Sequence, residues 1–214
     1  MSKSRENTAG DGNRNGNGVT RRSFIKGMGA GVVTTAILPS VVSAGVDLET
    51  IRAPEEGVTR ATITLNVNGE SKRVTVESRA TLANTLRNEL NMTGTKVVCD
   101  RGECGGCSVL IDGDPAYSCM TLAMDAADRE ITTIEGLAKN GQLSPVQQAF
   151  VDFDAYQCGY CTSGQIMAAT GLLEKNSNPS FSEIQRGMSG NICRCAAYQH
   201  IFAAVADAAK KGRG

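Results

Sequence analysis

Eight cysteines at short, regular intervals constrain the fold of this 214-residue chain more than any other feature. The first set begins with the segment CDRGECGGC, whose spacing is C-x4-C-x2-C, and a fourth cysteine follows after eleven residues. The second set is a C-x2-C pair and, 31 residues later, a C-x-C pair. The first set is Cys99, Cys104, Cys107 and Cys119, and the second is Cys158, Cys161, Cys193 and Cys195.

Three kinds of structure could use these thiols. Four disulfides would suit an even count in an exported chain, but near-adjacent cysteines seldom reach disulfide geometry without strain. Zinc is a second alternative, although four-cysteine zinc sites favour two C-x2-C pairs. C-x4-C-x2-C followed by a more distant cysteine is the plant-type ligand pattern of a 2Fe-2S cluster. We therefore expect two such clusters; in the second, each close cysteine pair is able to hold one iron.

The glycines of the first cysteine loop fit this interpretation. Gly102, Gly105 and Gly106 can adopt positive φ angles at little cost. A loop of that kind can direct backbone N–H groups at a negatively charged group. We expect these three glycines to shape the loop around a cluster.

The N-terminus predicts export. Arg21 and Arg22 precede an apolar run at 27–38, and Val-Ser-Ala ending at Ala44 has the small residues of a cleavage site. The run is shorter than the roughly 20 residues of a membrane span. The segment resembles bacterial twin-arginine signals, which implies export of a folded protein to the periplasm; a general secretory peptide or an anchor is the alternative. We assign 1–44 to the signal and 45–60 to a linker.

The remaining roughly 155 residues suffice for one ordinary domain or two small ones. The formal net charge is zero and both signs are interspersed, so the composition favours no nucleic-acid partner. We also expect no membrane span in the mature protein. The chain has no Trp and only 4% aromatic residues, which predicts a modest hydrophobic core supported by something else.

Residues 61–137 predict a small mixed sheet around one helix, a β-grasp arrangement. Two alternating strands surround an Asn68-Gly69 turn, a helix follows Thr81, and further strands flank an Asp112-Gly113 turn and continue into the segment REITTIEGL. Apolar residues carry the pattern: Ile63, Leu65, Val67, Val74, Val76, Leu82, Leu86, Leu90, Val109 and Ile111.

Residues 138–210 predict an all-α domain, so the fold class is α+β. Four segments have helical spacing, and the first opens with Ser144 as cap and Pro145 at the first helical position. Each cysteine pair of the second set lies where a helix begins or ends. His200, the only histidine, is expected on a helix surface.

Three segments together resemble the iron-sulfur subunit of the xanthine oxidase family of molybdenum hydroxylases, especially the exported small subunit of aldehyde oxidoreductases. They are GTKVVCDRGECGGCSVLIDG, YQCGYCTSGQIM and MSGNICRCAAY. The resemblance implies a plant-type cluster in a β-grasp domain and a second cluster in a four-helix domain. It also implies a heterotrimer with a large molybdopterin-binding subunit and a medium FAD-binding subunit. Two residues depart from the family pattern, Val98 and Ala196.

By this resemblance the chain relays electrons from molybdopterin through two clusters to FAD, and Gln157 and Cys195 lie against the pterin. From sequence alone, Gln157 could equally be an exposed loop amide. A carbon monoxide or N-heterocycle hydroxylase subunit would share these features. The sequence also leaves open a stand-alone two-cluster carrier and a disulfide-stapled binding protein.

Overall fold

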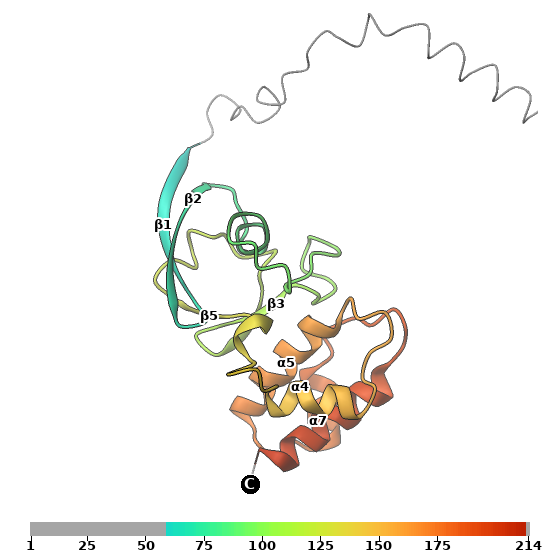
Figure 1. The fold of residues 1–214 in the computed structure, drawn as a ribbon. Coiled ribbons are helices and arrows are strands. Elements are labelled where there is room, and N and C mark those ends of the chain that lie inside the picture. The colour runs from blue at the N-terminus through green and yellow to red at the C-terminus, as the bar shows by residue number, and fades with distance from the viewer. Residues whose placement is uncertain (1–58, 213–214) are drawn as a thin grey trace, which may run out of the picture. The chain divides into compact units, whose positions relative to one another are not determined.

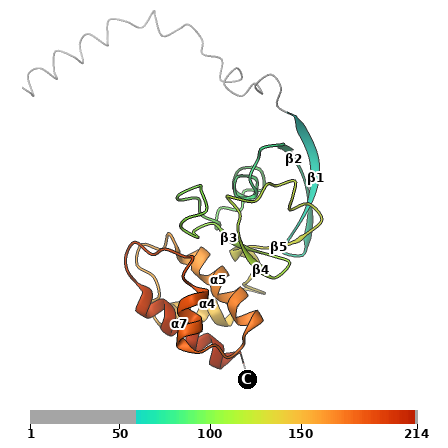
Figure 2. The ribbon, with the colours of Figure 1, turned by 180° about the vertical axis from the view of Figure 1, so that it is seen from behind.

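The computed structural model describes residues 59–212, in which a sheet region precedes a helical region (Figures 1 and 2). The predicted export signal and nearly all of the predicted linker lie outside the described residues. The described chain is mixed α and β, as the sequence predicts.

Five strands form one mixed sheet in the order β2-β1-β5-β3-β4. β1 runs antiparallel to β2 but parallel to β5, and β3 pairs antiparallel with both β5 and β4. The chain therefore returns to the centre of the sheet with its last strand. The strands are β1 (Arg60–Val67), β2 (Glu70–Glu77), β3 (Ser108–Ile111), β4 (Asp114–Tyr117) and β5 (Glu130–Thr132).

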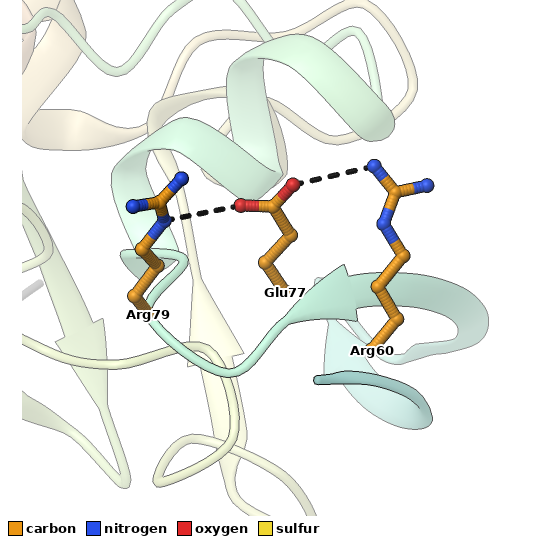
Figure 3. Close-up of polar contacts among 3 residues, drawn as sticks. All are labelled: Arg60, Glu77 and Arg79. Carbon is orange, nitrogen blue, oxygen red and sulfur yellow. Dashed lines mark hydrogen bonds and ion pairs between the residues drawn. The ribbon is translucent and has the colours of Figure 1, made fainter. Parts of the chain in front are cut away.

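Both predicted hairpin turns are present. Asn68 and Gly69 have φ angles of 55° and 79°, and Asp112 and Gly113 have φ angles of 53° and 83°. Two consecutive positive φ angles match the right-handed twist of the flanking strands, and Asn, Asp and Gly tolerate them best. At the open end of the first hairpin, Glu77 lies between two guanidinium groups (Figure 3). Its carboxylate oxygens are 3.2 Å from Arg60 Nη2 and 3.2 Å from Arg79 Nε.

One helical segment, which follows β2 and precedes β3 in the chain, packs on the sheet. It begins as α3 (Leu82–Asn84), with Thr81 Oγ1 accepting the N–H of Asn84, and continues as the π-helical η1 (Thr85–Glu89). The wider turn shows in the 3.0 Å bond from the Leu90 N–H to the carbonyl of Thr85. Leu82 and Leu86 are buried as the periodicity predicts.

β3 is more buried than its sequence suggests. The alternation at Val109 and Ile111 predicts a strand with one buried face, but all four residues of β3 are buried. α5 (Thr162–Lys175) packs against β3, and Gly171 lies close to the side chain of Leu110. Helix α5, from the second half of the chain, thus covers the face of β3 that the alternation predicts to be exposed.

A short 3-10 turn, η2 (Ile134–Gly136), leads into the helical region. α4 begins as predicted, because Ser144 and Gln147 form a reciprocal capping box and Pro145 occupies the first turn. The helices share a core that includes Phe150, Ile184 and Ile201. They are α4 (Pro145–Asp152), α5, α6 (Phe181–Gly187) and α7 (Tyr198–Lys211).

Among residues 59–212, no helix combines the length and apolar character that crossing a bilayer requires.

Candidate metal centres

The eight cysteines lie in loops and at helix starts, and all of them are free thiols. The segment 99–107 connects η1 to β3, and Cys119 follows β4. In the second set Cys161 is the N-cap residue of α5, whereas Cys193 and Cys195 immediately precede α7. Disulfide pairing, which the sequence left open, is absent from the described chain.

The first set gathers as two neighbouring pairs. The thiol of Cys99 interacts with that of Cys104, and the thiol of Cys107 with that of Cys119. All four thiols also lie near one phenol: burial first, and then the charges of the four thiols, raise the pKa of Tyr117. Four sulfur ligands in two pairs match a cluster with two iron atoms.

The second set pairs differently from the sequence-based expectation. The thiol of Cys158 interacts with that of Cys195, and the thiol of Cys161 with that of Cys193. Each neighbouring pair therefore takes one cysteine from the C-x2-C motif and one from the C-x-C motif. This arrangement differs from one iron for each close pair, because the chain folds the two motifs against each other; which cysteines share an iron stays a prediction.

Burial keeps part of each set protonated until a cation arrives. Burial raises the pKa of Cys107 to about 12 and that of Cys161 to about 12. By contrast, backbone N–H groups, chiefly that of Arg101, lower the pKa of Cys99 to about 7. A backbone hydrogen bond from Tyr160 likewise lowers the pKa of Cys158. Each set thus has one thiol that ionises more readily than an ordinary cysteine and one buried thiol that iron would deprotonate.

Cys195 differs from its partner. A backbone hydrogen bond from Cys158 favours the thiolate of Cys195, but the neighbouring Cys158 thiol and burial outweigh it and raise the pKa of Cys195. Within this pair the proton therefore stays on Cys195, and Cys158 ionises first.

The backbone of the first loop is shaped for a negatively charged group. Asp100, Gly102 and Gly105 have positive φ angles of 52°, 76° and 68°, and the N–H of Glu103 donates to Cys99 Sγ at 3.4 Å. Gly106 differs from the expectation because its φ is not positive. A Cβ built at Gly106 would instead lie 3.0 Å from Val98 Cγ2, so close packing explains this glycine.

The two departures from the family pattern have different consequences. Val98 is 57% exposed and has an ordinary φ, so it does not strain the entry to the loop. Ala196, directly after the last cysteine, has a φ of 60°. A left-handed conformation is unfavourable for a residue with a Cβ, so this position stores backbone strain beside the second set.

Three polar groups beside the second set were not anticipated from the sequence. The hydroxyl of Tyr198 accepts the backbone N–H of Cys193 at 2.9 Å. The hydroxyls of Thr162 and Ser163 are buried next to Cys161 and have no hydrogen-bond partner in the described chain. Buried polar groups are nearly always satisfied. Sulfur atoms of a cluster held by Cys161 would supply the missing acceptors, so the residues present fit such a group.

A single zinc ion fits less well. Within residues 59–212, no three or more His, Cys, Asp or Glu side chains converge on a point where one metal ion could bind. A structural zinc site needs four ligands around one ion. The paired arrangement of the thiols suits two irons instead.

The other two residues singled out from the sequence lie on the surface. Gln157, immediately before Cys158, is exposed, and its side chain makes no hydrogen bond within the described chain. His200 is exposed on α7, where its Nδ1 lies 2.9 Å from the carbonyl oxygen of Phe153. The helix-surface position of His200 is confirmed, whereas the part of Gln157 in binding a pterin stays a prediction.

A β-grasp sheet and a helical region, each with four gathered thiols, define a protein with two iron-sulfur domains. Two family matches agree with this class. Residues 65–138 match the 2Fe-2S iron-sulfur cluster binding domain, and residues 133–206 match the [2Fe-2S] binding domain. The chain belongs to the iron-sulfur small subunits of the xanthine oxidase family of molybdenum hydroxylases.

The relatives are subunits of oxidoreductases. The chain is 43% identical over 207 residues to the aldehyde oxidoreductase iron-sulfur-binding subunit of Escherichia coli, covering 89% of this chain and 88% of that one. It is 48% identical over 149 residues to the nicotine 6-hydroxylase small subunit of Paenarthrobacter nicotinovorans, covering 70% of this chain and 90% of that one.

Two solved structures share the fold. Quinoline 2-oxidoreductase from Pseudomonas putida superimposes with a TM-score of 0.70 at 41% identity, over 72% of this chain and 96% of the matched chain. The aldehyde oxidoreductase from Desulfovibrio desulfuricans gives a TM-score of 0.68 at 39% identity, over 72% of this chain but only 17% of that longer chain.

Proposed function

We propose that this chain is the electron-transfer subunit of an exported, molybdenum-containing aldehyde oxidoreductase. Its eight cysteines hold two 2Fe-2S clusters, in domains at 61–137 and 138–210. One partner subunit carries molybdopterin and oxidises the aldehyde, and a second carries FAD and takes the electrons. The observation that carries the proposal is the presence of two thiol sets in adjoining domains of one chain, each arranged as two pairs.

The chain itself supplies the cysteine ligands and shields part of each cysteine set from water. Each cluster, when bound, accepts and returns one electron, so two of them suit a relay and not the two-electron oxidation itself. Buried Cys107, Cys119 and Cys193 place part of each set away from water. Among residues 59–212, no group of His, Cys, Asp and Glu offers a site for a single metal ion that could act on a substrate directly.

A partner must cover the second set. Tyr156, Tyr160 and Ile192 are 44%, 52% and 52% exposed around it. Clustered exposed apolar side chains mark interaction surfaces. A small apolar cleft of about 130 Å³ opens between the two cysteine sets. It is lined by Val98, Cys104, Gly106, Cys158, Tyr160, Cys161, Ile192 and Arg194.

We assign the molybdopterin subunit to this face, with Gln157 and Cys195 toward the pterin. Gln157 has a free amide able both to donate and to accept, and a pterin ring offers complementary groups. Aldehyde is favoured as the substrate class because the similarity to the aldehyde oxidoreductase subunit extends over 89% of the chain. An N-heterocycle is the second candidate, supported by the 48% identity to the nicotine 6-hydroxylase subunit.

Isolation of the complex tests this function. We expect a large and a medium subunit to accompany the chain, together with iron, acid-labile sulfide, molybdenum and FAD, and we expect aldehydes to reduce the clusters. Changing Cys104 to Ser should abolish one cluster signal in electron paramagnetic resonance (EPR) and leave the other. Paired disulfides without iron, or stoichiometric zinc, would contradict the cluster assignment. Oxidation of N-heterocycles but not aldehydes would favour the second candidate.

We further propose that the chain is exported folded to the periplasm through its twin-arginine signal, with cleavage after Ala44. Cluster assembly needs reduced thiols, and unfolded thiols in an oxidising compartment would form disulfides first. Replacing Arg21 and Arg22 by lysine should retain the loaded protein in the cytoplasm. Normal export of that variant would overturn the twin-arginine route without affecting the cluster assignment.

A further inference from the structure

The two cysteine loops touch through their backbones. The N–H of Ile192 donates to the carbonyl of Cys104 at 2.9 Å. Cys104 belongs to the first thiol set, and Ile192 is bonded directly to Cys193 of the second. One hydrogen bond therefore joins a proposed ligand of one cluster to the neighbour of a proposed ligand of the other.

A buried asparagine reinforces this contact. Asn191 is only 5% exposed, and its Nδ2 donates to the carbonyl of Gly105 at 2.9 Å and to Ser108 Oγ at 3.3 Å. The backbone carbonyl of Asn191 accepts a hydrogen bond from Gln165 Nε2 at 3.0 Å. Since Gln165 lies in the first turn of α5, just after Cys161, Asn191 ties together both cysteine loops and the helix that carries Cys161.

Glycines allow this close approach. A Cβ at Gly105 would lie 2.6 Å from Asn191 Nδ2 and 2.6 Å from the carbonyl oxygen of Gly190. A Cβ built at Gly164 would overlap the carbonyl oxygen of Gly105. Tyr117 closes the same contact, with its hydroxyl donating to Gly190 at 2.8 Å. The separation of the loops is therefore set by close backbone packing and by short hydrogen bonds from the side chains of Asn191 and Tyr117.

We propose that Asn191 is a positioning residue that fixes the distance and orientation of the two cysteine loops, and thereby the coupling between the clusters bound there. The inference rests on the proposed function because it requires two clusters. It adds no chemical step, since Asn191 acts on the loops and not on an electron carrier. The carbonyl of Gly105 also accepts the N–H of Ser108 at 3.1 Å and its hydroxyl at 2.8 Å, but Asn191 Nδ2 is the side-chain donor that reaches this carbonyl from the second cysteine loop. Without that donor, the bonds left between the loops within residues 59–212 are those from Ile192 and Tyr117, so the separation and orientation of the loops are less tightly fixed.

The test compares Asn191→Leu, which keeps a similar shape without the donor, with wild type. Asn178→Leu is the matched control, because Asn178 is exposed. Ser108→Ala is a second variant that keeps the Asn191 donor to Gly105 but removes the other acceptor of Asn191 Nδ2, together with the bond from the Ser108 hydroxyl to the carbonyl of Gly105. Each protein is isolated with the subunits that accompany it, and its iron content is measured. The spin–spin interaction between the two reduced clusters is measured by EPR, and the rate at which they exchange an electron after partial reduction is followed.

We expect Asn191→Leu to retain iron and both cluster signals, with a weaker spin–spin interaction and slower exchange, and Ser108→Ala to show a smaller change in the same direction. Wild-type interaction and exchange in Asn191→Leu would overturn the proposal. If both variants lose one cluster and leave the other unchanged, Asn191 only stabilises that site and the proposal is again overturned. A wild-type protein without two cluster signals would instead contradict the proposed function.

Discussion

The hydroxyl of Tyr198 accepts the backbone N–H of Cys193 at 2.9 Å, so the first residue of α7 holds the turn that carries the last two cysteines. Within residues 59–212 the N–H of Cys193 has no second acceptor, and Cys193 is buried. Loss of the phenol oxygen would leave that N–H unpaired.

We therefore expect Tyr198→Phe to lower the free energy of unfolding by about 1 kcal/mol, within the usual range for an intramolecular hydrogen bond. The EPR signal of the second cluster should broaden or lose intensity while that of the first is retained. Thermal unfolding and EPR of the reduced protein measure both effects. Tyr156→Phe is the control, since Tyr156 is 44% exposed. Equal changes in both cluster signals would count against a local role for Tyr198.

The strained backbone at Ala196 predicts a stabilising substitution. Ala196 has a φ of 60°, and Ala196→Gly removes the Cβ that makes this conformation unfavourable. We expect a net gain of about 1 kcal/mol in stability, because the relief of strain exceeds the extra freedom of glycine in the unfolded chain.

Denaturant unfolding of the loaded protein measures this gain. Ala203→Gly, in the interior of α7, is the matched control and should lose about 1 kcal/mol. A loss of stability in Ala196→Gly as large as in Ala203→Gly would show that the left-handed conformation carries no strain.

The unpartnered hydroxyl of Thr162 predicts a change in reduction potential. If this hydroxyl donates to cluster sulfur, it favours the more negative, reduced state, and Thr162→Val should lower the potential of the second cluster only. A differential stabilisation of about 1 kcal/mol corresponds to about 40 mV for one electron.

A redox titration followed by EPR measures the shift. Thr170→Val is the control, because the Thr170 hydroxyl already donates to the carbonyl of Ile166 at 2.8 Å within α5. An unchanged potential in Thr162→Val would mean that the hydroxyl does not face the cluster.

Substitution of Gln157 tests the proposal that this face of the chain contacts the pterin. Gln157→Ala should leave both cluster signals and assembly of the complex intact, because the residue is exposed and makes no hydrogen bond within residues 59–212. Reduction of the clusters by aldehyde should slow, or molybdenum content should fall. Gln185→Ala, an exposed position on α6, should change neither. A wild-type turnover rate with full molybdenum content in Gln157→Ala would make Gln157 an ordinary loop residue.

Local features of the fold were predictable because they depend on near neighbours in the chain. The turns at Asn68-Gly69 and Asp112-Gly113 follow from residues that tolerate positive φ. The start of α4 follows from Ser144 and Pro145, which satisfy or avoid unpaired N–H groups at a helix end. The two cysteine sets could be recognised from the sequence for the same reason, because the spacing within each motif is a local property.

The features that the sequence did not predict depend on tertiary packing. Full burial of β3 requires α5, which lies more than 50 residues further along the chain, to cover the sheet. Nothing in the sequence indicates that Gly164 and Gly190 are required for packing. In the structure a Cβ at Gly164 would overlap Gly105, and a Cβ at Gly190 would overlap the hydroxyl of Tyr117. The crossed pairing of the second thiol set likewise follows from the way α5 and α6 bring the chain back, which no spacing rule encodes.

The two sites close chain segments of different length. In the first set, Cys99 pairs with Cys104 and Cys107 with Cys119, so a bound cluster closes only short loops. In the second, the link from Cys161 to Cys193 encloses both α5 and α6, and acts as a cross-link across much of the helical region. Long loops are the ones whose closure removes most freedom from an unfolded chain. Binding of the second cluster therefore removes more freedom from the unfolded chain than binding of the first, and loss of iron should destabilise the helical region more than the sheet region.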